Sequence, residues 1–77
     1  MYNDYNNLTL NTANVLEFFS EYRKMDVRYW KHRNGQEQMN EDDYSYLRSK
    51  RHTYRTIMEM LGMVDAYYKW MEDMGME

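Results

Sequence analysis

The residue types able to carry out catalysis are few and scattered in this sequence. Its two histidines, His32 and His52, belong to no His-Glu-x-x-His pattern, and the chain has no cysteine, so neither a metal site nor a thiolate site is predicted. The serines lack a base and an orienting acid at a usable spacing. The acidic pairs 42–43 and 72–73 diverge by about 100° on a helix, so they do not form a dyad. We therefore expect a protein without enzymatic activity, metal or other cofactor.

A second group of residues combines cations with aromatic rings. The runs 28–33 (RYWKHR) and 48–55 (RSKRHTYR) interleave the two types, as nucleic-acid surfaces often do, because phosphates take the charge and bases stack on rings. The candidate contacts to nucleic acid or to an acidic partner are Arg28, Trp30, Lys31, Arg33, Arg48, Arg51 and Arg55. A solvated, ion-paired helix face explains the same runs, and the acids at 41–43 would repel phosphates. Nucleic acid binding is therefore the alternative function.

A third group is apolar and repeats with a helical period near the end of the chain. Its members recur at steps of three or four and are Met60, Met63, Tyr67, Trp70 and Met74. Such a stripe is core if the N-terminal residues or a third helix cover it. Residues 1–11 are short and polar, however, and interface centres are enriched in Tyr, Trp and Met. We therefore expect these residues to bind a partner.

Two helices are expected to position these groups. Apolar residues between Val15 and Tyr29 follow a helical period, and cations at 31–33 with Gly35 mark an end, which predicts a helix over about 12–34. Asn40 and the acids at 41–43 mark the start of a second helix, in which a heptad pattern continues to about 74. The short connector predicts an antiparallel helical hairpin that pairs Phe18 with Ile57 and Val15 with Leu61.

Two details of this all-α fold stay open at this point. A glycine within a helix costs about 1 kcal/mol relative to alanine, so a three-helix bundle with a break near Gly62 is the alternative to a continuous helix over 41–74. The hairpin register predicts that Lys50 lies beside Asp26. It also predicts that Leu8, in an N-terminal arm (residues 1–11), docks near Tyr68.

Chain length limits the number of domains and favours oligomerisation, and charge is unevenly distributed along the chain. With 77 residues the chain forms one domain, predicted over 12–77, and a core of this size is marginal without oligomerisation. We expect a homodimer in which two hairpins form a four-helix bundle. The net charge is −3, but nine Lys and Arg against five acids give +4 over residues 23–55, while one Lys against five acids gives −4 over residues 56–77.

These features predict a small protein–protein interaction module, a regulator or inhibitor acting through the Met60–Met74 stripe. The alternative is a dimeric nucleic-acid-binding accessory protein that uses the basic end. No signal peptide and no apolar run of about 20 residues is present, so we expect a cytoplasmic protein without membrane contact. The small size and the Tyr, Met and Asn bias are similar to those of short phage and mobile-element proteins that bind and inhibit host machinery.

Overall fold

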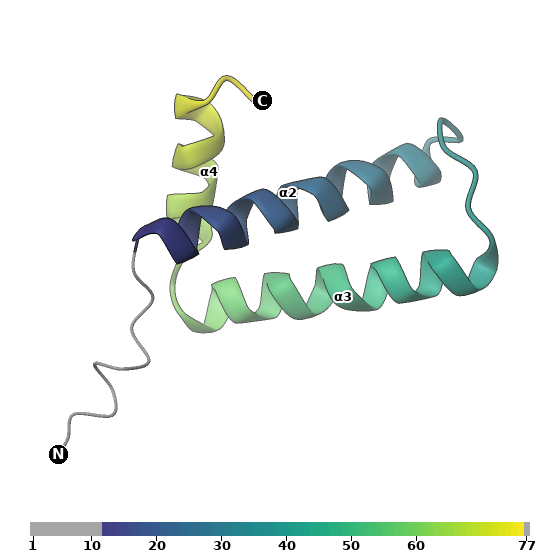
Figure 1. Ribbon diagram of the computed structural model, residues 1–77, viewed down its shortest axis with the longest axis horizontal. Helices are drawn as coiled ribbons and strands as arrows, with labels where there is room; N and C mark the ends of the chain where they lie inside the picture. Colours follow the sequence, from purple (N-terminus) through teal and green to yellow (C-terminus); the bar gives the residue numbers. More distant parts are fainter. Residues whose placement is uncertain (1–11, 77) are drawn as a thin grey trace, which may run out of the picture.

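The computed structural model describes residues 12–76, which form three α-helices (Figure 1). These are α2 (Thr12–Arg33), α3 (Glu41–Met60) and α4 (Val64–Asp73). The all-α prediction is confirmed, and no strand occurs within the described range. The predicted N-terminal arm and its docking near Tyr68 involve residues 1–11, which lie outside that range.

Local sequence signals set the ends of α2 and α3. After Arg33 the chain reverses at Gly35, whose φ is 79°, and the N–H of Gln36 donates to the carbonyl of Lys31 over 2.7 Å. This is the glycine-terminated helix end that the sequence predicted. At the start of α3, the side chain of Asn40 accepts a hydrogen bond of 2.7 Å from the N–H of Asp43. That bond satisfies one of the free N–H groups of the first turn.

The helix predicted over 41–74 is interrupted at Gly62, so the continuous-helix prediction is wrong and the break proposed as its alternative is present. Gly62 has φ 66°, and the N–H of Met63 donates to the carbonyl of Met58 over 2.8 Å, which closes α3. A Cβ atom on Gly62 would meet nothing within 4 Å. Glycine is therefore needed here for its left-handed backbone conformation and not for space.

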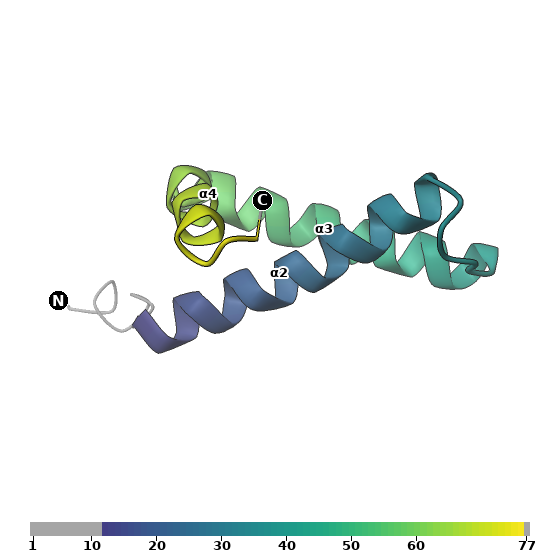
Figure 2. The same cartoon turned by 90° about the horizontal axis from the view of Figure 1, so that it is seen from above.

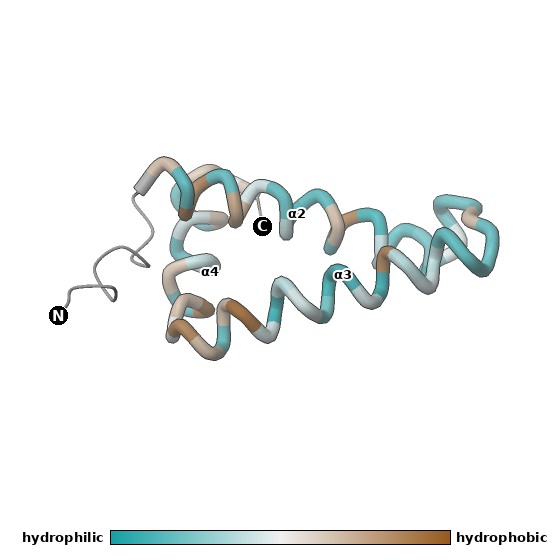
Figure 3. The backbone as a smooth tube through the Cα atoms, turned by 60° about the horizontal axis from the view of Figure 1, so that its bottom comes forward, coloured by the Kyte–Doolittle hydropathy of each residue, from teal (hydrophilic) through white to brown (hydrophobic). Residues whose placement is uncertain are grey.

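The break turns α4 across the other two helices. α2 and α3 lie side by side in opposite directions, and α4 crosses them at the end where α2 begins (Figures 1 and 2). The hydropathy colouring of Figure 3 places many of the apolar positions toward this end. The main core lies there, and its buried members are Phe19, Tyr22, Met58, Tyr67 and Met71. Toward the 34–40 turn only two helices meet, with Met25 and Leu47 buried between them.

The packing of α2 on α3 differs from the predicted register. Phe18 stacks on Tyr54 at 4.5 Å between ring centroids, instead of packing on Ile57. Asp26 bonds to Arg51 at 2.7 Å, instead of to Lys50. The side of α3 that faces the core carries Met58, which is fully buried because it contacts residues of both α2 and α4. Ile57 and Leu61 are rotated toward solvent, so their predicted pairing with α2 is wrong.

Candidate functional site

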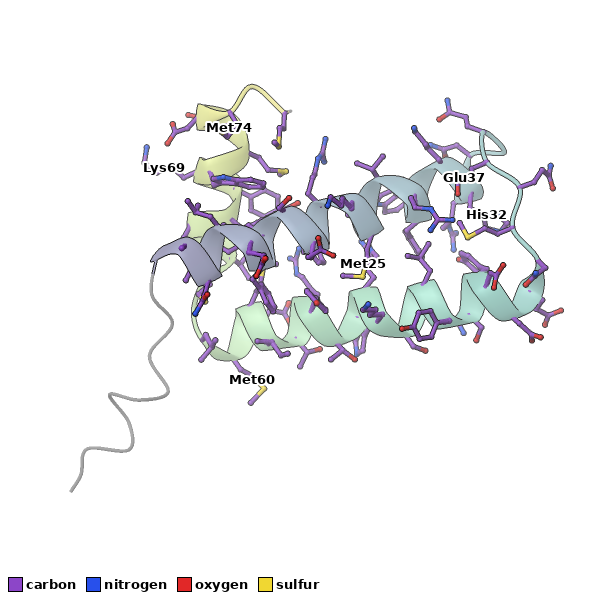
Figure 4. The ribbon with its side chains drawn as sticks, viewed as in Figure 1. Met25, His32, Glu37, Met60, Lys69 and Met74 are labelled. Carbon is purple, nitrogen blue, oxygen red and sulfur yellow. The ribbon has the colours of Figure 1, made fainter. Side chains whose placement is uncertain are left out.

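The predicted apolar stripe does not form one surface. Tyr67 is only 1% exposed, and Trp70 packs against Phe19 with ring centroids 5.7 Å apart. Met60 and Met74 are 79% and 60% exposed, but Figure 4 shows them at different places, on the end of α3 and on the far end of α4. The middle of the stripe is therefore core, as the alternative interpretation had it, but no further helix covers it within residues 12–76: the turn at Gly62 places it on α4, which packs on α2. Partner contact by Met60 and Met74 remains a prediction.

A different group of apolar side chains lies exposed along α3. We call it the α3 strip, and its members are Tyr46, Ile57, Met60 and Leu61. At about 100° per residue these four fall within an arc of about 100°, on the side of the helix opposite Arg55. Arg55 reaches α4, where its Nη1 donates to the hydroxyl of Tyr68 over 3.2 Å. The α3 strip therefore faces away from α4, and its side chains are 36–79% exposed in the described structure.

The sequence contained a signal for this strip that the heptad reading missed. Leu47, Arg51, Tyr54 and Met58 follow steps of four, three and four, which define one helix face as well as the heptad positions do. The structure uses that face for packing, since Met58 is fully buried and Leu47 is nearly so. Once that face is inward, Ile57 and Leu61 must point outward.

A groove borders the α3 strip where α3 approaches α2. Its volume is about 360 Å³. Met25 and Leu47 are buried at its base, and Figure 4 shows Met25 between the two helices. Tyr46 and Lys50 form the wall on α3, with the Lys50 ammonium 5.7 Å from the centre of the Tyr46 ring. The groove thus combines an apolar base with a wall continuous with the strip.

Four of the seven predicted cation and aromatic contacts come together on the opposite side of α3. Tyr29 and Tyr44 stack with centroids 5.9 Å apart and planes inclined by 16°. Arg51 lies 4.2 Å and Arg33 5.8 Å from the centre of the Tyr29 ring, and Arg48 lies 6.0 Å from that of Tyr44. Trp30 meets Tyr29 edge to face at 5.1 Å. We call this group, Tyr29, Trp30, Arg33, Tyr44, Arg48 and Arg51, the guanidinium–aromatic cluster.

The remaining predicted cations lie elsewhere. Arg28 pairs with Glu37 at 2.9 Å on the side of the groove, and Arg55 pairs with Glu59 at 3.4 Å. Lys31 is exposed on α2 about 160° around the helix from Tyr29, so it does not join the cluster. The ion-paired interpretation of the basic runs is therefore right for these arginines.

Charge within the cluster is only partly balanced by carboxylates. Arg51 pairs with Asp26 at 2.7 Å, and both side chains are mostly buried. Arg33 and Arg48 are exposed and have no carboxylate partner among residues 12–76. Hydrogen bonding by the Tyr44 hydroxyl raises the pKa of the Arg33 guanidinium above its usual value. A cavity of about 360 Å³ opens beside these side chains, lined by Tyr29, Arg48, Ser49, Arg51 and His52.

The histidines do not converge. His32 donates from Nδ1 to the carbonyl of Glu37 at 3.0 Å, and Figure 4 places both residues at the turn between α2 and α3. His52 lies on α3 beside the cluster cavity. Within residues 12–76, no group of three His, Asp or Glu side chains is arranged to hold a metal ion. No described helix is both long and apolar enough to cross a membrane.

The contact of α4 with α2 contains two polar groups. The guanidinium of Arg23 donates to the carbonyl of Met76 over 2.7 Å and so holds the chain beyond α4. The hydroxyl of Tyr67 is buried and has no hydrogen-bond partner of acceptable geometry within residues 12–76, although the nearby Arg23 guanidinium acts to lower its pKa. Burial, followed by the negative charge of Asp26, raises the pKa of Tyr67 to about 12.

Comparison with known proteins adds no assignment, since no protein-family model, curated protein or solved structure matches this chain. A proposal for function therefore depends on the α3 strip and the guanidinium–aromatic cluster.

Proposed function

We propose that this chain is a small, non-enzymatic protein–protein interaction module that self-associates through the α3 strip. The observation that carries the proposal is the exposure of Tyr46, Ile57, Met60 and Leu61, at 68%, 36%, 79% and 56%, along one side of a single helix. Ile57, Met60 and Leu61 adjoin at the end of α3, whereas Tyr46 lies about 16 Å along the helix, beyond Thr53 and Lys50. Scattered apolar residues are normal on a protein surface, whereas neighbouring ones such as the first three mark a contact surface. Tyr and Met are also among the residue types enriched at interfaces.

The spacing of the strip fits a second copy of the same chain. A two-fold interface is self-complementary, so residue i meets j and j meets i. If two α3 helices pack antiparallel around the midpoint of Thr53 and Tyr54, Tyr46 lies opposite Leu61 of the partner subunit and Lys50 opposite Ile57 of the partner subunit. Lys50 can cover an apolar side chain with its stem and keep its ammonium in water. Each apolar end of the strip thereby gains an apolar neighbour.

The groove supports the same register. An antiparallel pair places Met60 of the partner subunit opposite Leu47 and Leu61 of the partner subunit opposite Tyr46. Both positions line the groove beside the strip, whose volume of about 360 Å³ accommodates apolar side chains. A flexible methionine suits such an irregular space.

The register also fixes the architecture of the dimer. The α2 and α3 helices of two copies then form a four-helix bundle with α4 on the outside. Dimerisation adds apolar burial that a 77-residue chain otherwise lacks. We propose that the dimer acts as a regulator or inhibitor, with Met74 on α4 available to a further protein.

The test is the mass of the protein in solution, measured by light scattering or sedimentation from low micromolar to near-millimolar concentration. We expect the wild type to be dimeric and the double variant Ile57→Glu, Leu61→Glu to be monomeric. Burial of an aliphatic side chain contributes about 1.5–3 kcal/mol, so two such losses weaken the dimer by at least 100-fold, to order of magnitude. The matched control, Ala66→Glu with Met74→Glu, adds the same charge at exposed sites on α4 and just beyond its end, and should stay dimeric.

Circular dichroism should show that both double variants keep the helical content of the wild type, because all four substituted side chains are exposed. A wild type that stays monomeric at every concentration would rule out self-association. A control that dissociates as readily as the strip variant would place the interface elsewhere.

A further inference from the structure

The guanidinium–aromatic cluster offers unpaired positive charge next to an exposed ring. Arg33 and Arg48 have no carboxylate partner in the described range and lie 5.8 Å and 6.0 Å from the ring centres of Tyr29 and Tyr44, which stack on each other. A guanidinium packed on a ring keeps its N–H groups free at the edge, where they form two parallel bonds to a phosphate. Trp30 stands beside them and is 49% exposed. Cation and ring are thus presented together by α2 and α3.

From this arrangement we infer that the cluster binds single-stranded nucleic acid, with phosphates on Arg33 and Arg48 and an unpaired base on Trp30. Stacking on an aromatic side chain requires a free base face, which a duplex does not present along its length. The cavity lined by Tyr29, Arg48, Ser49, Arg51 and His52 adds a donor-rich recess of about 360 Å³ beside the rings. The recess lies next to the arginines that would hold the phosphates.

The electrostatics of the site allow this ligand despite the net charge of −3. The acidic excess belongs to residues 1–22 and 56–77, whereas residues 23–55 carry +4. The first turn of α3 carries Glu41, Asp42 and Asp43, whose carboxylates would repel phosphates. They limit how far the nucleic-acid backbone can extend along α3 toward its start. We therefore expect a short site that contacts two or three phosphates.

An acidic peptide fits the same cations less well. The Arg51 guanidinium already lies 5.8 Å from the centre of the Trp30 ring, but the residue stays 49% exposed. An acidic peptide would satisfy Arg33 and Arg48 but would leave this exposed part of the ring without a planar partner. A nucleotide uses both features at once, because its phosphate and its base are held at a fixed separation by the sugar.

The cluster is independent of the proposed dimer contact. Arg48 and Arg51 lie on α3 about 100° and 40° from Leu47 in one direction, whereas the α3 strip lies in the other direction. The nucleic acid site therefore stays open whether or not the chain dimerises. Failure of one proposal leaves the other untouched.

The experiment measures fluorescence anisotropy of a labelled single-stranded oligothymidylate with the full chain at low salt, and then titrates salt. Contact with two or three phosphates predicts a slope of log K against log salt of roughly −1.4 to −2.1. Arg33→Glu with Arg48→Glu should lower affinity at least ten-fold and flatten that slope. The matched control is Lys24→Glu with Lys69→Glu, which has the same net charge but changes exposed lysines outside the cluster. It should bind within about three-fold of the wild type.

A second variant separates stacking from charge. Trp30→Ala should weaken binding by roughly 5- to 150-fold, the range that loss of one stacked base implies, without changing the salt slope. Trp30→Phe should recover part of the loss, because a smaller ring still stacks.

Three results would each overturn the inference. One is absence of oligothymidylate binding at low salt, and another is an equal loss in the Lys24 and Lys69 control. The third is competition by polyglutamate as strong as by unlabelled oligothymidylate, which would assign the cluster to acidic proteins instead.

Discussion

Replacing Tyr67 by phenylalanine is expected to make the protein more stable. The Tyr67 ring lies in the main core, edge to face with Phe19 at 5.4 Å and with Tyr22 at 5.0 Å. Its hydroxyl is buried there without a hydrogen bond to any described residue. Phenylalanine keeps both ring contacts and removes a polar atom that lost its water on folding.

The size of the gain follows from the cost of burying that atom. An unsatisfied buried polar group costs about 1–3 kcal/mol of stability. Removing the oxygen leaves a small void, and the cost of that void offsets part of the gain. We expect a net gain of about 1–2 kcal/mol in the free energy of unfolding at neutral pH. In a domain of this size each kcal/mol corresponds to a Tm shift of roughly 4–8 °C.

The same hydroxyl predicts a dependence on alkaline pH. Burial and the charge of Asp26 raise the pKa of Tyr67 to about 12 in the folded state, compared with about 10 in the unfolded chain. Because the folded pKa is the higher one, the folded state holds the proton more tightly. Ionisation of Tyr67 therefore leaves the free energy of unfolding unchanged below pH of about 10 and lowers it as the pH rises toward 12. Two pH units correspond to about 2–3 kcal/mol, and Tyr67→Phe lacks this alkaline loss.

Urea and thermal denaturation, followed by far-UV circular dichroism from neutral to alkaline pH, measure both effects. Tyr46→Phe is the control, because Tyr46 is largely exposed and its hydroxyl is in water. It should change stability little at neutral pH and leave the alkaline loss as in the wild type. If Tyr67→Phe is less stable than the wild type, or loses stability as steeply above pH of about 10, the hydroxyl has a favourable partner and the reasoning fails.

Three further substitutions test the elements that define the fold. Gly62→Ala forces an L side chain to φ 66° and should lower the free energy of unfolding by about 1–2 kcal/mol in urea denaturation. Gly62→Asn should lower it less. An unchanged urea midpoint in Gly62→Ala would mean that the turn is not required. Asn40→Ala removes the bond to the N–H of Asp43 and should cost about 1 kcal/mol and lower Tm, while Asn40→Ser should retain most of it. Met58→Ala empties a fully buried position and should cost about 2–5 kcal/mol by chemical denaturation; a cost below about 1 kcal/mol would contradict the core assignment.

Features that depend on a few neighbouring residues were predictable from the sequence. The end of α2 at Gly35 and the start of α3 at Asn40 act through backbone groups within three to five positions, so residue type alone specifies them. The all-α class follows in the same way from periodicity. The guanidinium–aromatic cluster was foreseen in part, because Trp30, Arg33, Arg48 and Arg51 were identified by type. Their meeting around Tyr29 and Tyr44 was not foreseen.

Packing choices between distant segments were not predictable. Two faces of α3 had comparable apolar spacing, and the face containing Met58 packs inward because it can contact α2 and α4 together. That choice turned Ile57 and Leu61 outward and created the α3 strip.

The sequence by itself determined the all-α class, the end of α2 at Gly35, the start of α3 at Asn40 and the presence of a glycine at position 62. Only the tertiary structure decided whether that glycine would interrupt the helix. A continuous helix gains hydrogen bonds along its axis, whereas a turn loses some of them and buries Tyr67 and Met71 against α2. The burial of two large side chains outweighs the loss of a few backbone bonds at a residue that adopts φ 66° without strain. This balance depends on where α2 lies, and no local pattern specifies that position.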